Sequence, residues 1–138
     1  MADELILIVE DNEKNLKLVR DLLQVKGYRT LEARTGELGV ELARRHTPHL
    51  ILMDIQLPGM GGAAALGQLK ADPTTAPIPV LALTAFAMQD DRRRFLAAGF
   101  DGYLVKPMNI HELLGVVREF CERRSPHPAP LAQDKREV

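Results

Sequence analysis

The segment LILMDIQLPGMGG, residues 50–62, begins with four long apolar side chains, continues through Asp54, and ends in a glycine-rich stretch. An apolar run of this length is typical of a strand covered on both faces, as in a parallel sheet. Pro58 and the glycines indicate a loop after the strand, and a helix is predicted over 63–70. Asp54 is therefore expected directly after a buried strand.

The same alternation of strand and helix extends in both directions from this segment. Strands are predicted over 5–9, 28–32, 50–53, 78–83 and 103–105, and helices over 12–26, 36–46, 63–70, 87–98 and 110–123. Strand-helix pairs with short connections predict a parallel sheet with right-handed crossovers and helices on both faces. The sequence thus predicts a doubly wound α/β fold.

The length and composition favour one domain. The chain has 138 residues, of which 46% are hydrophobic, and its single cysteine, Cys121, cannot form an internal disulfide. Residues 1–124 are predicted to form the domain. Residues 125–138 contain three prolines without apolar periodicity, so a flexible tail is expected there.

Charge and hydropathy exclude two classes of partner. The formal net charge of -1 gives no positive field for a nucleic-acid backbone. The apolar runs are far shorter than the roughly 20 residues that cross a bilayer, and no basic-then-apolar leader precedes them. We therefore expect a cytoplasmic protein without a membrane partner.

Polar residues follow four of the predicted strands, at the edge where ligands bind in open parallel sheets. They are Glu10, Asp11, Asp54, Thr84 and Lys106. Each alone fits an ordinary role, such as a helix N-cap or a solvated lysine. Together they would place three carboxylates at one edge, where repulsion raises a pKa unless a cation joins them. Oxygen ligands without histidine or thiolate favour a hard ion such as Mg²⁺.

These residue types suit phosphoryl transfer, in which positioning and charge neutralisation supply most of the catalysis. Asp54 is the candidate nucleophile, because a carboxylate can form an aspartyl phosphate. Lys106 and the Thr84 hydroxyl are the candidates to stabilise the phosphoryl oxygens.

The chain resembles the receiver domains of two-component response regulators. The resemblance rests on Glu10-Asp11, the segment 53–62, Thr84-Ala85 and Lys106-Pro107, and it extends over residues 4–123. It implies a five-stranded, flavodoxin-like (βα)5 fold with strand order 2-1-3-4-5. The segments 51–58 and 82–88 resemble DivK-type single-domain regulators of bacterial cell division. Receivers attached to hybrid histidine kinases share much of the sequence of these segments.

The resemblance also implies roles for individual residues. Glu10, Asp11, Asp54 and the backbone carbonyl of Gln56 would hold Mg²⁺. Asp54 would accept phosphate from a histidine of a partner kinase or phosphotransfer protein. Thr84 and Tyr103 would form a switch pair that remodels the face made by the fourth helix, fifth strand and fifth helix, which a downstream protein would read.

Three further features bear on this interpretation. Many receivers have an acid where this chain has Gly61, so a cap of the third helix is predicted to be missing. An alternative is a metal-dependent phosphatase of haloacid dehalogenase type, but such enzymes place an acid where this chain has Gln56. A flavodoxin-like cofactor site is disfavoured because Glu10 and Asp11 would repel a phosphate. A regulator rather than an enzyme is therefore expected.

Overall fold

The computed structural model describes residues 4–57, 59–85, 89–106 and 109–123. Within these ranges, strands and helices alternate along the chain. They are β1 (Leu5–Val9), α1 (Glu13–Val25), β2 (Arg29–Ala33), α2 (Gly36–His46), β3 (Leu50–Asp54), α3 (Gly62–Ala71), β4 (Val80–Thr84), α4 (Gln89–Ala98), β5 (Gly102–Val105) and α5 (Ile110–Arg123). The predicted start of the fourth helix at residue 87, Pro107 and the predicted tail at 125–138 lie outside the described residues.

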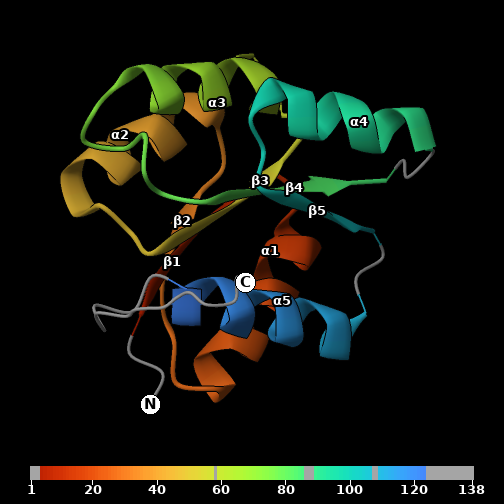
Figure 1. The fold of residues 1–138 in the computed structure, drawn as a ribbon. Helices are drawn as coiled ribbons and strands as arrows, with labels where there is room; N and C mark the ends of the chain where they lie inside the picture. Colours follow the sequence, from red (N-terminus) through yellow and green to blue (C-terminus); the bar gives the residue numbers. More distant parts are fainter. Residues whose placement is uncertain (1–3, 58, 86–88, 107–108, 124–138) are drawn as a thin grey trace.

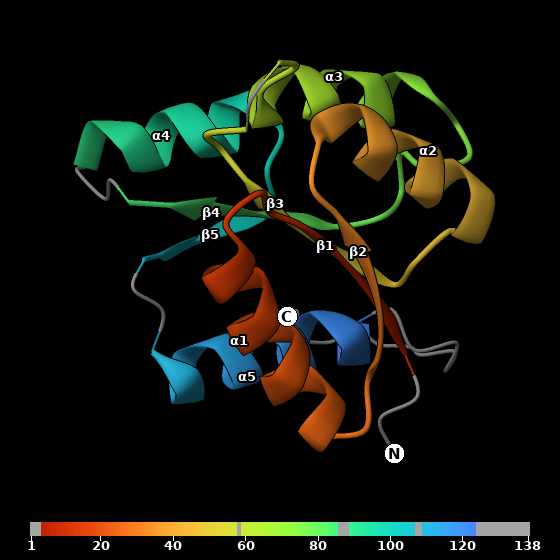
Figure 2. The same cartoon turned by 180° about the vertical axis from the view of Figure 1, so that it is seen from behind.

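The strands form one parallel sheet with the order β2-β1-β3-β4-β5 (Figure 1). Helices α1 and α5 cover one face of this sheet, and α2, α3 and α4 cover the other, as both views show (Figures 1 and 2). The predicted doubly wound fold and its strand order are confirmed.

Alternating side chains of each central strand supply the two halves of the core. In β1, Ile6 and Ile8 pack on the α1 and α5 side, whereas Leu7 and Val9 pack on the α2 and α3 side. All four are fully buried. Full burial of such a side chain contributes about 1.5–3 kcal/mol, so β1 is held firmly and fixes where the next two residues begin.

The register of the strands brings the predicted polar residues to one edge. Val9 pairs with Met53, so Glu10 follows β1 at the level of Asp54. Asp54 pairs with Leu83, and Thr84 pairs with Val105. Because all strands are parallel, Glu10, Asp54, Thr84 and Lys106 come at successive carboxyl ends of neighbouring strands.

A bilayer sets a minimum length and hydropathy for the helices that cross it. None of those in the described part of the chain is both long and apolar enough to cross a membrane.

Candidate functional site

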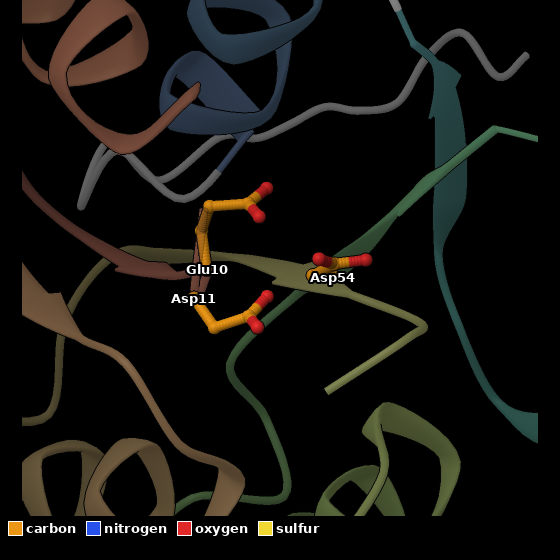
Figure 3. Close-up of side chains that lie close together, drawn as sticks. All are labelled: Glu10, Asp11 and Asp54. Carbon is orange, nitrogen blue, oxygen red and sulfur yellow. The ribbon is translucent and has the colours of Figure 1, made fainter. Parts of the chain in front are cut away.

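Three carboxylates meet at the carboxyl ends of β1 and β3 (Figure 3). Glu10 and Asp11 follow β1, and Asp54 is the last residue of β3. One oxygen from each lies within 4.8 Å of the others. Glu10 is 1% exposed and Asp54 is 4% exposed, whereas Asp11 is exposed. The cluster therefore has a buried base and one side open to solvent.

Backbone amides orient both buried carboxylates. Oδ1 of Asp54 accepts a hydrogen bond from the amide of Gln56 at 3.0 Å, and Oε2 of Glu10 accepts one from the amide of Asn12 at 3.1 Å. Asn12 is itself the N-cap of α1, where its side chain accepts from the amide of Asn15. The start of α1 thus fixes Glu10, and the turn after β3 fixes Asp54.

Lys106 supplies a cation to the same cluster. Its Nζ lies 2.9 Å from Oε1 of Glu10 and 3.1 Å from Oδ2 of Asp54. Its backbone amide donates to the carbonyl of Thr84 at 2.8 Å, which places the side chain beside β4. Burial alone would lower the pKa of Lys106, but the two carboxylates outweigh burial and raise this pKa. The ammonium is therefore charged at neutral pH.

For Glu10, burial outweighs the attraction of the nearby ammonium, so its pKa shifts against the charged form. Burial raises the pKa of Glu10; the ammonium of Lys106 opposes this effect, and the nearby Asp54 carboxylate adds to it. The Lys106 ammonium therefore does not fully offset the burial of Glu10.

The oxygen Oε1 of Glu10 tests whether a metal ion fits this cluster. It is buried, and its partner within the described ranges is the Lys106 ammonium at 2.9 Å, which is shared with Asp54. A carboxylate oxygen offers two lone pairs, so Oε1 of Glu10 has capacity for a further cation. Together with the all-oxygen donor set, this fits a hard divalent ion such as Mg²⁺.

The remaining predicted residues lie on the neighbouring strands. Thr84, at the end of β4, is 2% exposed and lines a cavity of about 500 Å³ beneath α4, together with Ile55 and Phe95. Tyr103 on β5 is partly buried, and its ring centroid lies 6.0 Å from that of Phe95. Gln56 is exposed and directly follows the Asp54 turn. The structure thus gathers the three acids, pairs Lys106 with Glu10 and Asp54, and places Thr84 and Tyr103 on the adjoining strands.

Two residues near the site have roles that the sequence did not reveal. Asn12 donates its backbone amide to Glu10, and a backbone contact of this kind has no signal in the residue type. Gly62, the first residue of α3, packs against the backbone of Asp54, for which the sequence gives no signal. The predicted loss of a cap is confirmed, because Gly61 at the N-cap makes no side-chain hydrogen bond.

Comparison with known proteins identifies close sequence relatives. The profile of the response regulator receiver domain matches residues 6–118. The polar-differentiation response regulators DivK of Brucella ovis and Brucella abortus are each 44% identical over 115 residues, which cover 83% of this chain and 94% of the relative.

Solved structures agree with this likeness. The receiver domain of a sensor histidine kinase from Pseudomonas aeruginosa has a TM-score of 0.81 and 36% identity over 88% of this chain and 99% of that one. That structure has a magnesium ion coordinated in its active-site cleft. A chemotaxis protein of Vibrio cholerae has a TM-score of 0.81 and 26% identity, covering 86% of this chain and 99% of its own.

Proposed function

This chain belongs to the response regulator receiver domain family of two-component systems, and from this premise we propose that Asp54 is the residue that accepts the phosphoryl group. The proposal rests on how the carboxylate cluster and Lys106 are arranged. Asp54 is the buried carboxylate at the centre of the sheet edge, with Lys106 Nζ 3.1 Å from one oxygen and the Gln56 amide 3.0 Å from the other.

The reaction is a transfer from a phosphohistidine. An oxygen of Asp54 attacks phosphorus, the nitrogen-phosphorus bond breaks, and the imidazole leaves with a proton in place of the phosphoryl group. Lys106 is placed to neutralise charge on the transferring oxygens, and the Thr84 hydroxyl donates a hydrogen bond to one of them. The product is an aspartyl phosphate, which water hydrolyses.

Glu10, Asp11, Asp54 and the backbone carbonyl of Gln56 would hold Mg²⁺. When bound, the ion supplies positive charge against the phosphoryl oxygens and the carboxylates. The buried Oε1 of Glu10 supports this assignment, as does the magnesium-bound receiver from Pseudomonas aeruginosa.

Phosphorylation would act as a switch rather than as enzymatic turnover. The phosphoryl group favours the conformation in which Thr84 and Tyr103 reposition, so the face made by α4, β5 and α5 changes for a downstream protein. The donor is a histidine kinase or a histidine phosphotransfer protein, in the cytoplasm. A phosphatase reaction is disfavoured because Gln56 cannot transfer a proton where such enzymes need an acid.

Two biological settings follow from the relatives. Likeness to DivK favours a regulator of polar differentiation that acts by protein contacts. Likeness to the receiver of a sensor histidine kinase favours a phosphorelay intermediate. Transfer assays with the histidine kinases of the source organism separate the two, because an intermediate passes its phosphoryl group on to a second histidine.

Intact mass after incubation with acetyl phosphate and Mg²⁺ tests the phosphorylation site. We expect one added phosphoryl group in the wild type and none in Asp54→Asn. Asp101→Asn is the matched control, because Asp101 is also a carboxylate at a strand end, where it accepts a hydrogen bond from the amide of Val80. Continued modification of Asp54→Asn would overturn the proposal, as would turnover of small phosphate esters without a stable adduct.

A further inference from the structure

Gly62 makes the closest backbone approach to the site. A Cβ atom at this position would lie 2.4 Å from the carbonyl oxygen of Asp54, 3.2 Å from its carbonyl carbon and 3.0 Å from Cα of Ile55. Distances below 3.0 Å cannot persist, and all three neighbours are backbone atoms that cannot rotate away. Only glycine therefore fits here without moving the chain that carries Asp54.

The backbone that Gly62 contacts has little freedom to move. The amide of Ile55 donates to the carbonyl of Leu83 in β4 at 3.0 Å, and the amide of Gly62 donates to the carbonyl of Ile55 at 3.2 Å. The peptide between Asp54 and Ile55 is thus held between the sheet on one side and the first turn of α3 on the other.

The need for glycine at this position is steric rather than conformational. Gly59 has a positive φ of 71°, a backbone conformation that side chains disfavour, but Gly62 is not among the glycines with positive φ. An added methyl group at Gly62 would therefore act through the contact with Asp54 and Ile55.

We propose that Gly62 is a positioning residue for the phosphorylation site. Its missing side chain lets α3 hold the Asp54–Gln56 turn in the geometry that aims the Asp54 carboxylate at the cation site. Displacing this turn moves the Gln56 amide that orients Oδ1 of Asp54. It also moves the Gln56 carbonyl, which would hold Mg²⁺ in the proposed site. The inference rests on the proposed function, because it concerns the same cluster.

The experiment compares three glycine-to-alanine variants. Gly62→Ala introduces the close contact with the backbone of Asp54 and Ile55. Gly67→Ala adds the same methyl group to the same helix at a position with nothing within 4 Å. Gly102→Ala adds it 3.1 Å from the flexible side chain of Leu81, at the opposite end of the sheet. These controls separate an effect on the site from effects on helix propensity and on stability.

The primary readout is the Mg²⁺ dissociation constant, measured from backbone amide chemical shifts without a phosphodonor. We expect Gly62→Ala to bind Mg²⁺ about 10- to 100-fold more weakly, as outer-shell changes do. The Mg²⁺ concentration for half-maximal phosphorylation by acetyl phosphate should rise by the same factor. Gly67→Ala and Gly102→Ala should keep the wild-type constant.

Three outcomes decide the matter. Wild-type Mg²⁺ affinity in Gly62→Ala would overturn the inference. So would a Gly62→Ala chain without a cooperative unfolding transition while Gly102→Ala folds, because the fold rather than the site would then require the glycine. A wild-type chain that neither binds Mg²⁺ nor takes up a phosphoryl group would instead overturn the proposed function on which the inference rests.

Discussion

The two ends of the sheet use the same charged residue types in opposite ways. At the amino end, the side chains of Asp101 and Lys70 complete the hydrogen bonding of the backbone. Asp101 accepts from the amide of Val80 at 2.8 Å, and Nζ of Lys70 donates to the carbonyls of Ala76 and Ile78 at 3.2 and 3.3 Å. At the carboxyl end, Lys106 lies between two carboxylates.

The difference shows where charge serves the fold and where it serves a ligand. Lys70 and Asp101 lie 3.8 Å apart and are tied mainly to peptide groups, so their contacts stabilise loops that lead into β4. Glu10 is buried, and the Lys106 ammonium beside it is shared with Asp54. A protein keeps such a group where binding of a cation offsets its cost.

The largest effect is expected from removing the cation at the carboxyl end. Lys106→Met keeps much of the apolar stem but leaves Glu10 and Asp54 without their ammonium. We expect phosphorylation by acetyl phosphate to slow by about 100-fold, since charge on the transferring oxygens is no longer neutralised. The rate is measured by intact mass against time at saturating Mg²⁺.

Lys70→Met is the matched control at the amino end. It removes the two hydrogen bonds to backbone carbonyls and should lower the unfolding midpoint while leaving the phosphorylation rate unchanged. Equal losses of rate in the two lysine variants would mean that the ends of the sheet do not differ in the way described above.

Glu10→Gln should separate stability from metal binding. The pKa of Glu10 is raised by burial, with Lys106 opposing and Asp54 adding, so the metal-free folded state disfavours the charged carboxylate. The neutral amide should raise the unfolding midpoint of the metal-free protein while weakening Mg²⁺ binding about 10- to 100-fold, the range for removal of a metal-site partner.

The pH dependence of this stability gain has a definite sign. A carboxyl whose folded pKa lies above its ordinary value of 4.5 destabilises the fold above that folded pKa, and the penalty disappears as the pH falls toward 4.5. The difference in midpoint between Glu10→Gln and wild type should therefore shrink with acidification. A gain that grows on acidification would contradict the burial argument.

The fold could be predicted because the sequence pattern of its central strands is unambiguous. Residues 5–9 and 50–53 are uninterrupted apolar runs, and the structure buries them on both faces. The first and last residues of a strand are harder to predict where strand and turn patterns overlap. Ile78 continues an apolar run and was predicted as strand, yet β4 begins at Val80, because Ile78 still belongs to the turn and donates its amide to the carbonyl of Thr75.

The residues of the site could be predicted from the sequence, but the contacts that hold them in place could not. Acids and a lysine after strands can be recognised because parallel strands end at one edge. Neither the use of the Asn12 amide by Glu10 nor the contact of Gly62 with Asp54 follows from residue types, since both depend on how a turn packs in three dimensions. Gly62 itself indicates only a loop in the sequence.

The smallest effect is expected at Asp72, which follows α3. The amide of Thr74 holds the pKa of this carboxyl below its ordinary value of 3.8; burial opposes the shift, and the guanidinium of Arg44 at 2.9 Å adds to it. Its sign is thus opposite to that of Glu10. Asp72→Asn keeps an acceptor for Thr74 but loses the charge, so the unfolding midpoint at neutral pH should fall by about 2 °C, as for an exposed ion pair.

A charge that the fold favours stabilises above the ordinary pKa, and its contribution is lost as the pH falls through the lowered folded pKa. Thermal unfolding of Asp72→Asn and wild type should therefore differ near pH 7 and converge below pH 3.8, the ordinary value. Metal binding should not change, because Asp72 lies outside the carboxylate cluster. If Asp72→Asn instead stabilised the chain at neutral pH, as expected of Glu10→Gln, the two carboxylates would not differ in kind and the contrast between the ends of the sheet would fail.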